Sequence, residues 1–250
     1  MNKNSVFHAY IVDVSKAAGL KNCITAQDLF SSIPSRVKLY DHVILSLIIG
    51  EKASEVIFGV KKSRYGLPDK QIIMCCLLEE ANRLNVCFRE NGTITSFVDY
   101  PVSTFGVCRC GYRPLYVATW LSQSQWVRLF LRYGASIYED DICRCHANKA
   151  HVLVKIFTAL TNNKFYNDFG AMSECFWLLT NELAPGRPLW REMLRWVPRM
   201  KRCMEDASSI PTLKHCTRYV IRSILREKKK LPFGIHELTL PDILKQYLSV

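Results

Sequence analysis

The sequence has few acidic residues and no long apolar run. Its 22 Asp and Glu residues are outnumbered by 34 Lys and Arg residues, which gives a formal charge of +12 at neutral pH. The longest uncharged apolar run, residues 43–50, is far shorter than the roughly 20 residues that a membrane-spanning helix needs. The N-terminus lacks a convincing signal-peptide cleavage site. We therefore expect a protein without a membrane partner that is cytoplasmic, with the nucleus as a further possible location.

The common catalytic motifs are also missing. The sequence contains no Walker-type phosphate loop, no Gly-x-Ser-x-Gly turn and no His-Glu-x-x-His pair. Cys143 and Cys145 lie near His146 and His151, but eleven cysteines and six histidines produce such neighbours by chance. We therefore expect neither enzymatic activity nor a cofactor.

The eleven cysteines favour free thiols over disulfides. Their number is odd, and Cys75, Cys76 and Cys175 lie inside apolar helical patterns, which is typical of buried reduced thiols. Two Cys-x-Cys pairs, at 108–110 and 143–145, are candidate zinc ligands. A single intervening residue is an awkward chelate, because structural zinc sites usually space their cysteines by about two to four residues. We expect no metal site.

Hydrophobic periodicity predicts a mostly helical chain. Apolar residues follow a helical or continuous pattern at 36–47, 53–60, 71–84 and 173–200, the last interrupted by a turn at 185–188. Residues 1–35 give mixed signals and are expected to form a helical or irregular lead-in. Asn91-Gly92, flanked by apolar residues, predicts a two-residue β-hairpin.

A central segment, residues 111–137, reads GYRPLYVATWLSQSQWVRLFLRYGASI. Pro114 can begin a first helix, Ala118 allows close packing, and Gly134 can end a second helix in a left-handed conformation. Residues 113–116 and 129–135 resemble the Thr-Pro-Leu-His and Leu-Leu-x-x-Gly-Ala motifs of ankyrin repeats. The resemblance implies a helical solenoid, which needs about three or more stacked repeats for stability.

A divergent second repeat is expected directly downstream. Cys108-Arg109-Cys110 recurs as Cys143-Arg144-Cys145, at an offset close to the ankyrin repeat length of about 33 residues. A helical apolar stripe follows at Val152, Leu153, Ile156, Phe157 and Leu160. Since ankyrin repeats bind through their concave face and loop tips, the resemblance nominates as substrate contacts Arg109, Tyr112, Arg113, Tyr116 and Trp120.

The strongest pattern lies near the C-terminus. Leu213, Thr217 and Ile221 recur every four residues, with further apolar side chains beside them, which predicts one continuous apolar stripe on a helix at 211–225. The alternative interpretation is an ordinary packing helix of the protein's own core. A basic linker, residues 226–230, follows this helix.

The last residues form a second motif. Leu238-Thr239-Leu240-Pro241 precedes a short apolar helix in which Leu244 and Leu248 share an edge. Pro241 can begin that helix, and Asp242 suits its N-terminus through the helix dipole. Together, the two motifs resemble the elongin-binding helix and the cullin box of a SOCS box. With the ankyrin-like segment they resemble the ankyrin repeat and SOCS box (ASB) family.

The resemblance implies a division into a lead-in (1–35), a repeat region (36–205, clearest at 108–140) and a three-helix SOCS box (206–250, cullin box 238–250). It implies that elongin C with elongin B binds at Leu213, Cys216, Thr217, Val220 and Ile221. It implies that cullin-5 with its RING partner binds at Leu238, Leu240, Pro241, Leu244 and Leu248. Thr217 replaces the usual cysteine and Thr239 the usual proline, which puts the strength of both contacts in question.

The expected function is therefore substrate recognition for a cullin-5 ubiquitin ligase, with an acidic protein as the substrate that the positive charge suggests. Two alternatives remain open at this point: an ankyrin scaffold without ligase function, and a nucleic-acid-binding protein. The second depends on a basic helical pattern with interleaved tryptophans at residues 187–202. A solvated basic face over a packed core explains that pattern more simply.

Overall fold

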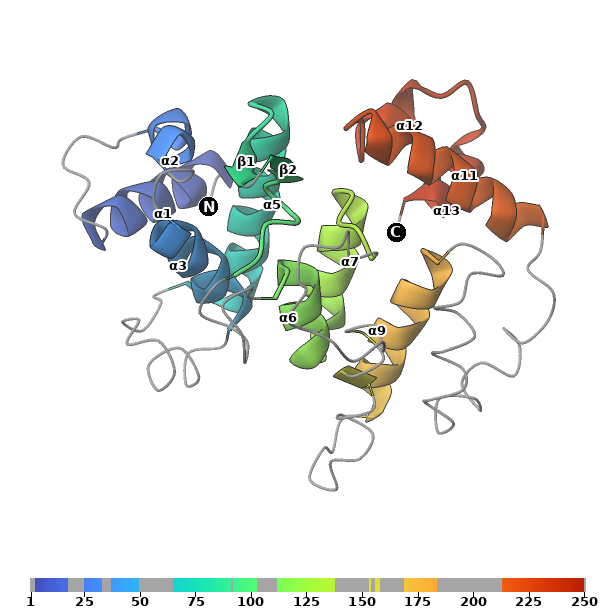
Figure 1. Cartoon of the computed structure of the whole chain (residues 1–250), viewed down its shortest axis with the longest axis horizontal. Helices are drawn as coiled ribbons and strands as arrows, with labels where there is room; N and C mark the ends of the chain where they lie inside the picture. Colours follow the sequence, from blue (N-terminus) through green and yellow to red (C-terminus); the bar gives the residue numbers. More distant parts are fainter. Residues whose placement is uncertain are drawn as a thin grey trace. The chain divides into compact units, whose positions relative to one another are not determined.

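The computed structural model describes residues 3–17, 25–32, 37–49, 65–90, 92–102, 112–137, 153, 156–157, 169–183 and 213–249. They belong to two compact units, Met1–Pro114 and Leu115–Val250. The described residues form ten helices and one two-stranded sheet (Figure 1), which confirms a mostly helical chain. The boundary at Pro114 lies inside the predicted repeat region, and helical content alone does not distinguish an ankyrin solenoid from other helical packings.

Four helices build the first unit: α1 (Lys3–Ala17), α2 (Ala26–Ser32), α3 (Val37–Ile48) and α5 (Leu67–Arg83). Helix α1 packs against α2 and α5, and α3 packs against α5. Val6, Tyr10 and Val14 recur every four residues on α1 and are buried, so this helix contributes to the core of the unit. Where it is described, the predicted lead-in is therefore helical. The predicted stretch at 53–60 lies outside the described residues.

The predicted hairpin is present. Strands β1 (Cys87–Glu90) and β2 (Thr93–Ser96) pair antiparallel, with Arg89 opposite Ile94 and Glu90 opposite Thr93. Gly92 has a φ of +80°, in the left-handed region that tight hairpin turns require. Gly92 therefore supplies the backbone conformation that this turn needs.

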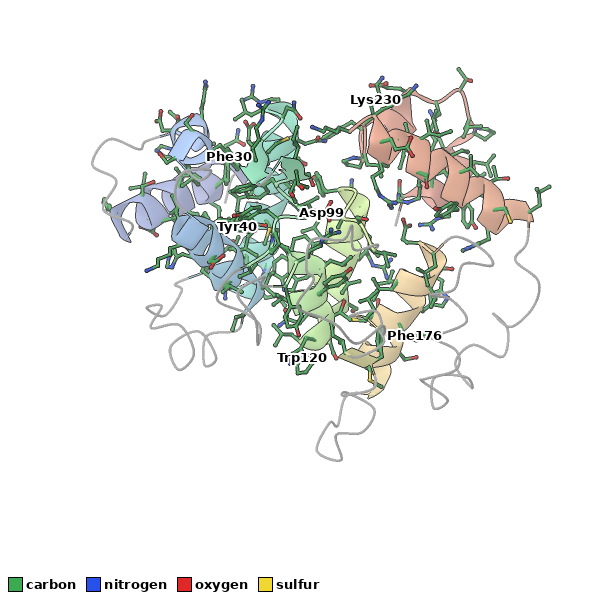
Figure 2. All side chains as sticks on the ribbon, in the orientation of Figure 1. Phe30, Tyr40, Asp99, Trp120, Phe176 and Lys230 are labelled. Carbon is green, nitrogen blue, oxygen red and sulfur yellow. The ribbon has the colours of Figure 1, made fainter. Side chains whose placement is uncertain are left out.

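Tyr40 lies at the centre of an aromatic cluster in the core of the first unit. Its ring meets the rings of Phe88, Phe97 and Tyr100 edge to face, at centroid distances of 5.2 Å, 5.2 Å and 5.2 Å. Its hydroxyl donates to the carbonyls of Phe97 and Tyr100, at 2.8 Å and 3.0 Å. Burial raises the pKa of the phenol well above its ordinary value. Tyr40 thereby joins α3 to the hairpin and the chain after it (Figure 2).

The second unit begins with a helix pair, α6 (Pro114–Trp120) and α7 (Ser124–Arg132), as the central segment predicts. Gly134 has a φ of +87°, and the amides of Gly134 and Ala135 donate to the carbonyls of Leu131 and Phe130. These two bonds are the Schellman pattern, which completes the end of α7. Helix α7 packs against α9 (Phe169–Asn181).

Part of the predicted downstream stripe is also described. Leu153, Ile156 and Phe157 are helical and buried, and the ring of Phe157 meets that of Phe176 on α9 edge to face at 5.0 Å. Val152 and Leu160 lie outside the described residues. The described part of the stripe therefore belongs to the core of the second unit.

The C-terminal residues form three helices, α11 (Leu213–Glu227), α12 (Gly234–Glu237) and α13 (Asp242–Leu248). Pro241 directly precedes α13, as predicted. Lys229 ends α11 with a φ of +53°, while the amides of Lys229 and Lys230 donate to the carbonyls of Arg226 and Leu225. The same Schellman geometry that ends α7 thus turns the chain from α11 toward α12.

Cysteine placement only partly follows the prediction. Cys175, Cys75 and Cys76 form no disulfide; Cys175 is buried, whereas Cys75 and Cys76 are only half-buried, because they flank the buried face of α5 that carries Ile73 and Leu77. The Cys-x-Cys pairs, His146, His151 and the basic stretch at 187–202 lie outside the described residues. Among the residues that are described, no cluster of metal-binding side chains occurs, and no helix has the length and apolarity for a membrane span.

Candidate functional site

One face of α11 exposes apolar side chains to solvent. We call this face, which consists of Leu213, Thr217, Val220 and Ile224, the outer stripe. The four residues are separated by four, three and four positions, so they lie on one side of the helix, and all four are exposed. The exposed fraction of Leu213 reaches 83%. Ile224 belongs to this surface but was not among the predicted elongin contacts.

The opposite face of α11 is buried and carries charge. Arg218, Arg222 and Leu225 lie on it at helical spacing. A helix that served the protein's own core would direct its apolar side to the interior and its charges to water. Because α11 buries two arginines and leaves Leu213, Val220 and Ile224 exposed, an ordinary packing surface does not explain the outer stripe.

Cys216 and Ile221 flank the outer stripe and are both half-buried. Ile221 packs against a small apolar cluster that consists of Leu225, Leu231, Ile235 and Leu248. Part of each flanking side chain still reaches the surface of α11. Of the five predicted elongin contacts, Leu213, Thr217 and Val220 are therefore exposed, and the other two are partly covered.

Three of the predicted cullin contacts belong to this apolar cluster or pack against it. Leu238 and Leu240 are half-buried against it, and Leu248 is one of its buried members. Leu248 therefore stabilises the fold of the module and is not available as a surface contact. The reason is geometric: α13 has one face toward the cluster, and Leu248 lies on that face while Leu244 is exposed.

The exposed side of α13 begins at Pro241 and continues through Ile243 and Leu244. All three are exposed, Ile243 to 73%. Ile243 was not among the predicted contacts because the apolar edge of this helix was inferred from the spacing of Leu244 and Leu248. An isolated exposed isoleucine is unremarkable, but here it adjoins two other exposed apolar residues.

Thr217 lies in the middle of the outer stripe, and no hydrogen bond of its hydroxyl occurs among the described residues. Thr119 on α6 behaves differently, since its hydroxyl donates to the carbonyl of Leu115 at 2.8 Å. A partner that covers the stripe would therefore remove the Thr217 hydroxyl from water without a bond from its own helix to replace the lost hydration.

The buried face of α11 is held by Glu182, which directly follows α9 and has an exposed side-chain fraction of 2%. Its carboxylate lies 2.8 Å from the guanidinium groups of both Arg218 and Arg222 and 3.0 Å from that of Arg226. Burial lowers the pKa of Arg222, and the charge of Glu182 opposes that shift. This ionic group was not predicted, because nothing in the sequence links position 182 to α11.

The predicted substrate contacts separate into buried and accessible residues. Arg113 is buried, with its guanidinium 3.7 Å from the carboxylate of Asp99, and Tyr116 is buried, with its hydroxyl donating to the carbonyl of Ile137 at 2.9 Å. These two side chains stabilise the fold and are not surface candidates. Tyr112 is half-buried, whereas Trp120, at the end of α6, is 40% exposed (Figure 2). Arg109 lies outside the described residues.

The comparisons with known proteins agree with the C-terminal geometry. A family model described as SOCS box matches residues 209–249. No curated protein and no solved structure matches the chain. The matched range includes α11, α12, α13 and the cluster that joins them. The C-terminal part of this chain, residues 209–249, is a SOCS box domain.

Proposed function

We propose that this protein is a substrate-recognition subunit of a ubiquitin ligase that contains elongin B, elongin C, cullin-5 and a RING protein. The observation that carries the proposal is the outer stripe, a solvent-exposed apolar surface on a helix whose other face is fixed by buried charges. It lies inside a SOCS box, and SOCS boxes recruit elongins and cullins in the proteins that contain them.

Elongin C would cover the outer stripe. Its contacts would be Leu213, Thr217, Val220 and Ile224, with the accessible edges of Cys216 and Ile221 at the sides. Burial of a large apolar side chain that was exposed contributes about 1.5–3 kcal/mol. Leu213, the most exposed apolar residue of α11, would therefore be the main energetic contact.

Cullin-5 would bind a different element, α13. Pro241, Ile243 and Leu244 are its exposed apolar residues. Leu238 and Leu240 would support this contact from the module's core, with their accessible edges alone facing the partner. Two contacts on separate helices can be removed independently, which makes the proposal testable in two halves.

The chain itself would carry out no bond chemistry. By holding a substrate beside the ubiquitin-loaded conjugating enzyme, the assembly would convert an encounter between separate molecules into a reaction within one complex. We propose that an ankyrin-type pair, α6 and α7, contributes to substrate binding. Its start at Pro114 and its end at Gly134 support this, and exposed Trp120 is its best remaining contact. The positive charge favours an acidic substrate.

Copurification tests the two contacts. The wild-type chain should capture elongin B and elongin C together with cullin-5. Leu213→Asp should abolish elongin capture, because a carboxylate would lose its hydration inside an apolar contact. Leu240→Ala/Pro241→Ala should retain the elongins and lose cullin-5. Lys229→Asp, an exposed charge reversal in the turn after α11 and outside the helical spacing of the stripe, is the matched control and should bind both.

The alternative functions give different results. A wild-type chain that captures no elongin would end the ligase proposal and leave an interaction scaffold. A nucleic-acid-binding protein would be retained on a polyanion column with a steep dependence on salt, because released counterions drive such binding. Capture of the elongins with no such retention is the result that the proposal requires.

A further inference from the structure

The buried side of α11 makes an unusual set of polar contacts with the ends of other helices. Arg222 donates to the carbonyl of Leu131, near the end of α7, at 2.8 Å, and to that of Leu248, at the end of α13, at 2.6 Å. Arg218 donates to the carbonyls of Asn181, at the end of α9, and Tyr247 on α13, both at 2.9 Å. Two side chains of α11 therefore reach the C-terminal ends of three helices.

These contacts explain how so much positive charge is tolerated in the interior. The last carbonyls of a helix have no partner within the helix, and they form the negative end of its dipole. Here α7, α9 and α13 direct such carbonyls at two guanidinium groups, and the carboxylate of Glu182 adds a full negative charge. The three helix ends supply the negative potential that one carboxylate alone would not.

The contacts also fix the direction of α11. Arg218, Arg222 and Arg226 are four residues apart, so Glu182 contacts successive turns along one side of the helix. Rotation of α11 about its axis would withdraw all three guanidinium groups from the carboxylate. A tilt of α11 would move the guanidinium groups at one end of the helix away from the carboxylate. A guanidinium group is planar with donors in fixed directions, which makes this arrangement stricter than one of lysines.

Further contacts extend this interface beyond the charges. The imidazole of His215 lies 3.3 Å from the carbonyl of Leu183, next to Glu182. A side-chain carbon added at Gly134 would lie 3.6 Å from Leu231 and 3.7 Å from Arg226, so the end of α7 is in close contact with the turn after α11. The segment 181–183 and the end of α7 thus contact α11 from its first turn to its last.

We infer that Glu182 is a positioning residue: through Arg218 and Arg222 it holds the SOCS box on α7 and α9 as one rigid body, and so sets the direction in which the outer stripe faces. This inference rests on the proposed function for its consequence, because the ligase would then be attached at a fixed angle to the helices nearest the substrate surface. Glu182 contacts the side of α11 opposite the outer stripe and is buried, so it would act on the orientation of the stripe and not as an elongin contact.

A distance measurement on the full-length chain tests the inference. Spin labels are attached through a ketone-bearing amino acid at two exposed positions, Gly170 on α9 and Glu227 at the end of α11, because eleven cysteines rule out thiol labelling. Pulsed electron paramagnetic resonance should give one narrow distance distribution for the wild type. Glu182→Gln keeps the size but removes the charge, and Arg222→Lys keeps the charge but loses the planar fork. Both should shift the distribution or broaden it at least twofold.

The matched control is Glu174→Gln on the same helix. Glu174 pairs with Arg128 at 3.0 Å and accepts from Ser124, but the pair is solvent-exposed and does not involve α11. The distance distribution of the Glu174→Gln variant should equal that of the wild type. Elongin capture should be unchanged in all three variants, which a general loss of folding would not allow.

A wild-type distribution that is already broad would overturn the inference, as would Glu182→Gln and Arg222→Lys variants whose distributions equal that of the wild type. Because the distances are measured on the chain alone, they remain informative if no elongin binds. Failure of the proposed function and failure of this inference therefore give separate results.

Discussion

Truncation of Leu213 tests whether the outer stripe is a binding surface or a packing surface. Leu213 is 83% exposed, so Leu213→Ala removes little that the folded chain uses. The free energy of unfolding should change by about 0.5 kcal/mol or less, as for surface substitutions in general. If elongin C covers the residue, the loss of three carbon atoms at about 0.8 kcal/mol each weakens binding by about 2.4 kcal/mol, or roughly 50-fold in Kd.

The control is Leu225→Ala on the same helix. Leu225 is a buried member of the module's apolar cluster, so its truncation leaves a cavity and should cost about 2–5 kcal/mol of stability. For a chain of this size that is a fall in Tm of roughly 4–20 °C. Thermal unfolding followed by circular dichroism gives the stability of both variants, and calorimetric titration with elongin B and elongin C gives the affinities.

The two substitutions should therefore have opposite effects on elongin affinity and on thermal stability. Leu213→Ala should lose affinity at constant Tm, whereas Leu225→Ala should lose Tm. If Leu213→Ala lowered the Tm as much as Leu225→Ala does, the outer stripe would be a packing surface and the reasoning would be refuted. Wild-type affinity in the Leu213→Ala variant would be equally damaging, because the most exposed apolar residue of α11 would then contribute nothing to the contact.

Three further changes test separate parts of the structure. Thr217→Val keeps the shape of the side chain but removes a hydroxyl whose burial costs about 1–3 kcal/mol, so it should tighten elongin binding roughly tenfold in the same titration; weaker binding would show that the hydroxyl finds a partner. Tyr40→Phe leaves two buried carbonyls without their donor and should cost about 1–3 kcal/mol in chemical denaturation; an unchanged midpoint would contradict that role. Burial lowers the pKa of His42, so below about pH 6.5 the unfolded chain binds the proton more readily and the folded chain loses stability as the pH falls. His42→Gln should reduce the loss between pH 7 and pH 5, and an equal loss in both chains would argue against it.

Local features were predicted well because neighbouring residues determine them. The hairpin with Gly92 in its turn, the helix start at Pro114 and the helix end at Gly134 each follow from the backbone preferences of one or two residues, and the structure has each of them. The helical stripe on α11 likewise follows from a spacing of three and four residues. Such signals need no knowledge of what lies elsewhere in the chain.

Burial was predicted less well because it depends on distant partners. Tyr116 and Arg113 occupy motif positions that suggested a binding surface, yet a carbonyl at Ile137 and a carboxylate at Asp99 hold them in the interior. Leu248 matched a contact motif but lies against the module's cluster. Periodicity states which residues share a face of a helix; it does not state whether water or protein lies on that face.

Glu182 shows most clearly what a motif cannot supply. No local signal in the sequence joins the basic residues of α11 to a glutamate after α9. Three arginines contact that carboxylate, and two of them also donate to the carbonyls of three helix ends, so charge determines much of the interior side of α11. The apolar side must then face water until another protein covers it. The combination of buried arginines with exposed Leu213, Val220 and Ile224 on one helix is therefore the physical reason to interpret this face of the SOCS box as a docking surface.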